Sequence, residues 1–87
     1  MSNQYIASVV KNKMAEIQQS IKDVEIILEA ANIFPERKKE IKEELGKVLF
    51  VLDTLYVENN YGELEKCHIY IESFRINIPN WENMDQV

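Results

Sequence analysis

One apolar stripe most strongly limits what this chain can fold into. Between residues 7 and 31, apolar side chains recur at alternating three- and four-residue spacing, the heptad pattern typical of coiled-coil-like helix packing. The stripe consists of Ala7, Val10, Met14, Ile17, Ile21, Val24, Leu28 and Ala31. This spacing places the stripe on one side of a single long helix, and that side must pack against other helices to be buried.

Two short turns, one just before Pro35 and one at Asn60, interrupt the helical pattern of the chain. Pro35 disfavours helical geometry at the preceding residue and is itself favoured at the first position of a helix. Asn60 is a suitable N-cap for a further helix. We therefore expect three helices, over about 3–31, 35–58 and 61–77. Pro79 ends the last of them, so that residues 1–79 form a single helical domain and residues 80–87 a flexible tail.

The third segment leaves one alternative open. Residues 69–78 are rich in β-branched side chains, and Phe74, Ile76 and Ile78 alternate as in a strand. We favour a helix, because two glycines and two prolines leave few turns for a many-stranded sheet. The connections between the expected helices are short, which places consecutive helices antiparallel. The expected fold is all-α, a three-helix antiparallel bundle with a long, heptad-patterned N-terminal helix.

Charge and composition argue against several classes of partner. The chain has a net charge of −5 and no basic stripe, which argues against nucleic acids and anionic membrane surfaces. Its longest purely apolar run, residues 48–52, is far too short to span a membrane. A single cysteine cannot form an intramolecular disulfide, and the first residues lack the layout of a signal peptide. We expect a cytoplasmic protein, and the abundance of Ile, Lys, Glu and Asn is typical of an AT-rich bacterial or phage genome.

Little in the chain points to catalysis or to a metal site. Cys67 and His68 are adjacent, so on a helix they point about 100° apart and cannot pair as nucleophile and base. His68 is the only histidine, and no second histidine or cysteine is present to complete a zinc site. The simplest interpretation is that Cys67 packs in the core and that His68 is hydrogen-bonded or exposed. We predict no catalytic, cofactor-binding or metal-ligating residue.

The chain carries more large apolar side chains than one bundle core requires. Surplus residues lie nearly opposite the main apolar stripes of the second and third helices. The candidate interface residues are Phe50, Val57, Tyr61, Ile69, Ile76 and Trp81. Trp81 either anchors an interface or packs back over the end of the bundle. Three alternatives remain for what buries the surplus residues: the core of a single monomer, a second copy of the chain, or a different protein.

These observations predict a protein that works by contact. We expect a homodimer that forms a larger helical bundle, since symmetric dimers are the commonest oligomers and a small core gains most from a second copy. The first hypothesis is a non-catalytic protein–protein interaction regulator of bacterial or phage origin, such as an inhibitor, antitoxin, immunity protein or adaptor, whose partner has a basic surface. The alternative is a structural homo-oligomeric scaffold with no separate partner. A third hypothesis is a small-ligand pocket lined by Tyr56, Cys67 and Tyr70.

Overall fold

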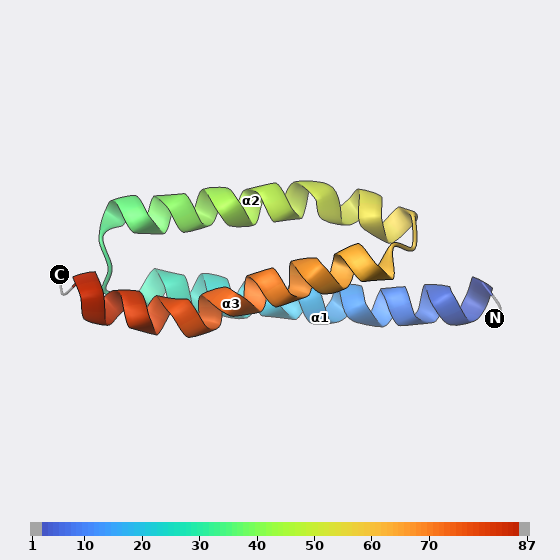
Figure 1. The fold of residues 1–87 in the computed structure, drawn as a ribbon, viewed down its shortest axis with the longest axis horizontal. Helices are drawn as coiled ribbons and strands as arrows, with labels where there is room; N and C mark the ends of the chain where they lie inside the picture. The colour runs from blue at the N-terminus through green and yellow to red at the C-terminus, as the bar shows by residue number, and fades with distance from the viewer. Residues whose placement is uncertain (1–2, 86–87) are drawn as a thin grey trace.

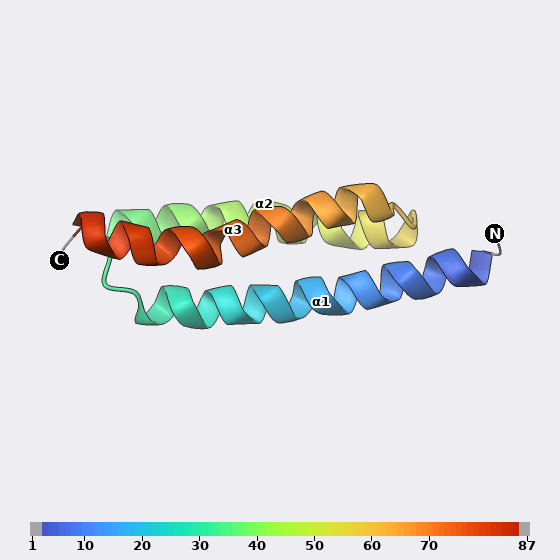
Figure 2. The ribbon, with the colours of Figure 1, turned by 60° about the horizontal axis from the view of Figure 1, so that its bottom comes forward.

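The fold consists of three long helices that run side by side (Figure 1). The structure, a computed structural model, describes residues 3–85. Its helices are α1 (Asn3–Ala30), α2 (Pro35–Val57) and α3 (Tyr61–Asp85), and no strand occurs in that range. α1 and α3 run in the same direction and α2 runs in the opposite one (Figures 1 and 2), which gives a rod of 52 × 18 × 16 Å. The prediction of three helices is confirmed, and the strand alternative for residues 69–78 is wrong.

The core lies along the rod, where the three helices meet. Seven of the eight stripe residues are buried, from Val10 to Ala31, which directly follows α1. Ala7 is exposed, because the first turns of α1 extend beyond the end of α2 and the start of α3 (Figure 1). The other buried apolar residues are Ile33, Ile41, Leu45, Leu52, Leu64, Ile71, Phe74 and Ile78. Because a large apolar side chain gains about 1.5–3 kcal/mol on full burial, this core is the main stabilising contribution.

Local sequence signals set where α2 and α3 begin. Pro35 is the first residue of α2, as predicted. At the start of α3, Asn60 Oδ1 accepts the backbone N–H of Glu63 at 3.3 Å, so Asn60 acts as the predicted N-cap. Asn59 has a positive φ of 54°, a conformation that asparagine adopts more readily than most residues.

The main correction concerns the end of α3. The sequence predicts that this helix ends before Pro79 and is followed by a flexible tail, whereas α3 continues through Pro79 to Asp85. The predicted tail is therefore wrong for residues 80–85, and residues 86 and 87 lie outside the described range. Proline has no N–H, so one hydrogen bond of the helix, to the carbonyl of Arg75, is lost.

Contacts with the turn between α1 and α2 hold the last turns of α3. Glu82 Oε2 accepts the backbone N–H of Asn32 at 3.1 Å, and Asp85 Oδ2 accepts that of Phe34 at 3.2 Å. Asp85 also receives two hydrogen bonds from Arg37, of 2.9 and 3.0 Å. A carboxylate here stabilises the N-terminus of α2, which has no side-chain cap from Phe34. These partners are 48–51 positions apart, so the local pattern of α3 does not reveal them.

Candidate interaction surface

Two rows of large apolar side chains face away from the core on different helices. Phe50 and Val57 of α2 are 86% and 81% exposed. Ile69 and Ile76 of α3 are 63% and 70% exposed. Members of each pair are seven residues apart, so they lie on the same side of their helix. The alternative in which one monomer core takes up all surplus apolar residues is therefore wrong for these four.

The other two candidates lie elsewhere. Tyr61 is not part of the row on α2, because it begins α3. Its ring centroid lies 5.7 Å from Lys13 Nζ on α1. Trp81 packs against the core, with its ring centroid 6.4 Å from that of Phe74 and 5.3 Å from the guanidinium carbon of Arg37. Of its two predicted positions, Trp81 therefore occupies the one over the end of the bundle.

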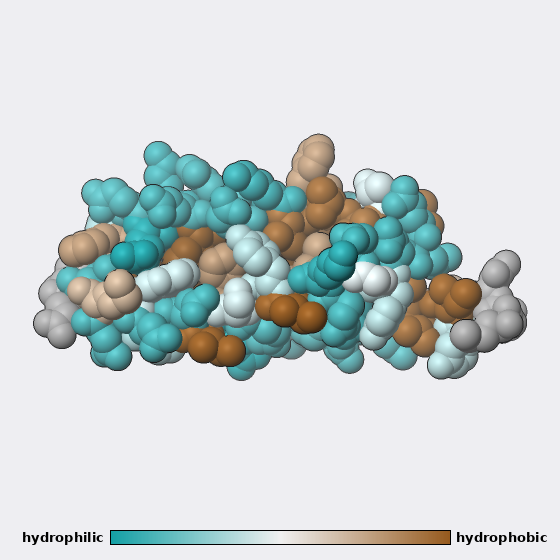
Figure 3. Space-filling model, in the orientation of Figure 1, coloured by the Kyte–Doolittle hydropathy of each residue, from teal (hydrophilic) through white to brown (hydrophobic). Residues whose placement is uncertain are grey.

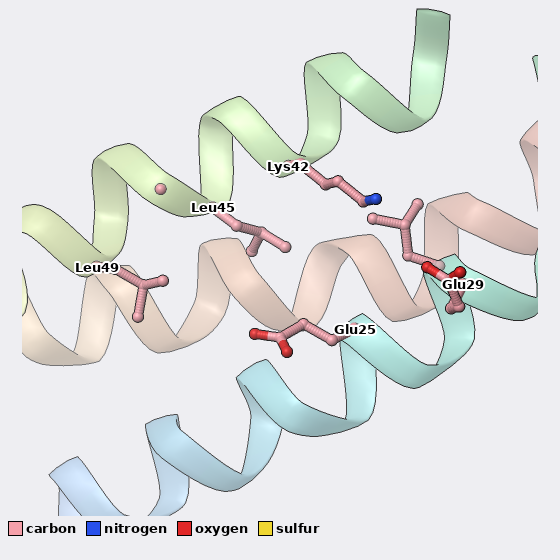
Figure 4. A pocket seen from close by; sticks show the side chains of 7 residues that line it. Glu25, Glu29, Lys42, Leu45 and Leu49 are labelled. Atoms are coloured by element: carbon pink, nitrogen blue, oxygen red, sulfur yellow. The ribbon is translucent and has the colours of Figure 1, made fainter. Parts of the chain in front are cut away.

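A groove between α1 and α2 adds a surface that the sequence analysis missed (Figure 4). It contains a cavity of about 300 Å³, lined by Glu25, Leu28, Glu29, Lys42, Leu45, Gly46 and Leu49. A neighbouring hollow of about 440 Å³ shares Glu25 and Leu49. On the face seen in Figure 3, apolar side chains project from α2 between hydrophilic stretches. The one sequence signal for this groove is Gly46, an isolated glycine inside a helical pattern.

A polar network joins α1 to α3. The Lys13 ammonium lies between carboxylates of both helices, 3.0 Å from Glu16 and 2.6 Å from Glu65. Its hydrogen bond with Glu65 raises the pKa of Lys13 and lowers the pKa of Glu65. Lys13 Nζ also lies 3.2 Å from His68 Nδ1, although the two residues are 55 positions apart. Charged hydrogen bonds therefore hold the two helices in register, and sequence spacing could not have shown this.

The hydrogen bonds around His68 define which ring nitrogen carries the proton. An ammonium can only donate, so Nδ1 of His68 accepts from Lys13. Ser20 Oγ donates to Glu72 Oε1 at 2.8 Å, so the Nε2–H of His68, 3.1 Å from this oxygen, donates to Ser20. The interpretation of His68 as a hydrogen-bonded part of the fold is confirmed.

Ser20 and His68 are not arranged as a serine nucleophile and its histidine base. In a serine–histidine pair the imidazole accepts the hydroxyl proton, but the Nε2 that faces Ser20 already carries one. Cys67 packs against the core, and burial raises the pKa of its thiol, whereas reactive cysteines have a lowered pKa. Among residues 3–85, no group of three His, Cys, Asp or Glu side chains is placed to hold a metal ion.

Two of the three residues proposed for a small-ligand pocket, Cys67 and Tyr70, make contacts within the chain, and the third, Tyr56, is 37% exposed. Cys67 packs against the core. The ring of Tyr70 meets that of Phe74 edge-on, with a centroid distance of 5.1 Å, and its O–H donates to Glu44 at 3.1 Å. The positions of these groups therefore give no support to the pocket hypothesis.

The Arg37–Asp85 pair makes the stability of the fold depend on pH. The hydrogen bond from the Arg37 guanidinium lowers the pKa of Asp85. A carboxyl with a lower pKa in the folded chain stabilises the fold above its unfolded pKa of about 3.9, and this contribution is lost as the pH falls through the folded pKa. We therefore expect Asp85→Asn to lower the melting temperature at neutral pH and to approach the wild type as the pH falls through the folded pKa of Asp85.

Thermal melts between neutral and acidic pH measure this effect. Glu58→Gln is a suitable control, because Glu58 is an exposed carboxylate at the opposite end of α2. The difference in melting temperature between Glu58→Gln and the wild type should stay small at every pH. If the difference in melting temperature between Asp85→Asn and the wild type were the same at every pH, the ion pair would not be the cause of the destabilisation.

Comparison with known proteins places this chain in no group: no family model, no curated protein and no solved structure matches it. Across residues 3–85, no helix combines the length and the apolar character that crossing a membrane requires. The function must therefore be inferred from the chain's own surface.

Proposed function

We propose that this chain is a non-catalytic protein–protein interaction regulator of bacterial or phage origin, of the inhibitor, antitoxin, immunity or adaptor type. The observation that carries the proposal is the pair of exposed apolar rows, Phe50 with Val57 and Ile69 with Ile76. Each of these side chains would gain about 1.5–3 kcal/mol if a partner buried it fully. The polar residues between α1 and α3 bond to one another, which supports a role in contact rather than in chemistry.

The row on α3 suits a partner with both basic and apolar side chains. Ile69 and Ile76 border a hollow of about 400 Å³ whose lining also includes Glu65 and Glu72. The chain as a whole has a net charge of −5. Acidic charge around an apolar centre speeds association with a basic partner and disfavours acidic ones. We therefore infer a cytoplasmic partner protein with a basic surface, and neither a nucleic acid nor a membrane.

Site-specific photocrosslinking tests this function. A benzophenone amino acid in place of Ile76 is expected to capture one distinct protein in the source cells. The same group at Lys66, an exposed polar position of α3, should not capture it. Ile76→Glu should abolish co-purification of that protein, because a carboxylate would have to be buried against it. Capture of this chain alone, or equal capture at both positions, would count against a regulator.

A second candidate function is a structural homo-oligomeric scaffold with no separate partner. Two observations favour it, the rod shape of 52 × 18 × 16 Å and the presence of apolar rows on two different helices. Two unlike surfaces can link one copy to the next without closing a ring. Light scattering separates the candidates, because a scaffold keeps gaining mass with concentration, whereas a regulator does not grow beyond a dimer.

A further inference from the structure

Gly46 lies in the interior of α2, and nothing inside the chain requires a glycine there. Glycine weakens a helix relative to alanine, and none of the described glycines has a positive φ. A Cβ added at Gly46 would meet no atom within 4 Å. Gly46 also lines the groove between α1 and α2. A helix without a side chain at this point lets a bulky group of another molecule approach closely.

Bulky apolar side chains follow Gly46 one turn later on the same side of α2. Leu49 and Phe50 lie three and four residues after it, the spacing at which side chains of a helix are neighbours. Leu49 is 47% exposed, and Phe50 is still more so. The open space at Gly46 and the exposed side chains of Leu49 and Phe50 are complementary if a second α2 packs antiparallel. The large side chains of each copy then fill the space at Gly46 of the other.

The charged residues near Gly46 are also consistent with two antiparallel α2 helices. Lys42 lies one turn before Gly46, and Asp53 lies one turn after Leu49. Neither Lys42 nor Asp53 has an ion pair or a side-chain hydrogen bond within residues 3–85. Two antiparallel α2 helices would set Lys42 of each copy opposite Asp53 of the other, whereas two parallel helices would set like charges opposite each other.

We propose that this face of α2 docks a second copy of the chain, with the two α2 helices antiparallel about a two-fold axis beside Gly46. Leu49 and Phe50 of each copy cover Gly46 of the other. The inference rests on the proposed function, in which α2 is a contact surface, and it names the occupant of that surface. The row of Ile69 and Ile76 belongs to α3, so it stays available to a separate protein.

The mass of the chain in solution tests whether a second copy docks. Sedimentation over a range of concentrations is expected to give twice the chain mass of 10.2 kDa. Gly46→Met adds a helix-favouring side chain where the single chain has open space, so circular dichroism should show an intact fold. It fills the gap that the second copy needs, and we expect it to weaken dimerisation about tenfold or more. Dimerisation of Gly46→Met at the wild-type affinity overturns the proposed geometry.

Charge reversal tests the antiparallel order. Lys42→Glu and Asp53→Lys are each expected to weaken the dimer, because each sets two like charges opposite each other at both ends of the contact. The double variant should recover most of the lost affinity, since the same pairs then form with their signs exchanged. A double variant as weak as the sum of the single ones overturns the antiparallel arrangement.

The outcomes separate this inference from the proposed function. A chain that remains at 10.2 kDa at every concentration overturns the dimer, even if crosslinking at position 76 still captures a basic partner and so supports a regulator. A dimer for which no partner is captured supports the docking of α2 and counts against the regulator. Crosslinking from position 50 to a different protein, in a monomeric chain, assigns the face of α2 to that protein and overturns the second copy.

Discussion

Replacing Ile17 with Asp is expected to unfold the chain. Ile17 is completely buried near the middle of α1. Loss of its apolar side chain alone costs about 2–5 kcal/mol, and an unpaired buried carboxylate adds several kcal/mol. Together these losses are comparable with the roughly 5–10 kcal/mol that stabilises a domain of this size. Far-UV circular dichroism at room temperature should show that most of the helical signal is lost.

The neighbouring residue provides a matched control. Gln18→Asp introduces the same carboxylate one position away, where α1 is exposed, and should change the free energy of unfolding by no more than about 0.5 kcal/mol. Ile17→Val, which removes one methylene group, should cost about 0.5–1.5 kcal/mol and still fold. If Ile17→Asp melted at the wild-type temperature, the buried side of α1 would be assigned wrongly.

Ending the chain after Asn80 is expected to destabilise it strongly, although the sequence predicts a flexible tail there. The deletion removes Trp81, which packs on Phe74 and Arg37. Because Trp81 is half-buried, Trp81→Ala alone should cost about 2–3 kcal/mol, below the value for a fully buried aromatic residue. This corresponds to a fall of about 10–20 °C in melting temperature. The deletion should cost more, because it also removes Glu82 and Asp85.

Met84→Ala is the control for this segment. Met84 lies on the same last turns of α3 but is 71% exposed, so its truncation should change the stability by no more than about 0.5 kcal/mol. Thermal melts compare the melting temperatures of the shortened chain, Trp81→Ala and Met84→Ala with that of the wild type. A shortened chain that melts at the wild-type temperature would show that residues 81–85 add nothing to the stability of the fold.

The end of α3 shows why a sound local rule can be wrong about a particular helix. Pro79 removes a single hydrogen bond, and in an isolated peptide the following residues would fray. Here Trp81 packs on Arg37 at the start of α2, and Glu82 and Asp85 accept backbone N–H groups of the α1–α2 turn, so that these contacts outweigh the loss. Their partners are about fifty positions away in the chain, and no pattern within α3 specifies them.

The candidate surface was predictable only in part. Helical spacing correctly placed Phe50, Val57, Ile69 and Ile76 outside the core, because residues seven apart share one side of a helix wherever the helix packs. The same spacing could not show that Tyr61 lies against α1, since that depends on where the chain reverses. It also could not show that a groove opens beside Gly46, because its width is set by the distance between two helices.

Sequence alone therefore specifies the three helices, the starts of α2 and α3, and the buried side of α1 from Val10 onward. These features follow from interactions over a few residues, such as the helical period, the fixed φ of Pro35 and the cap at Asn60. The tertiary structure alone decides that Ala7 lies beyond the core, that α3 passes Pro79, and which charges pair across helices. These depend on the relative lengths and positions of helices, which bring together residues about fifty positions apart.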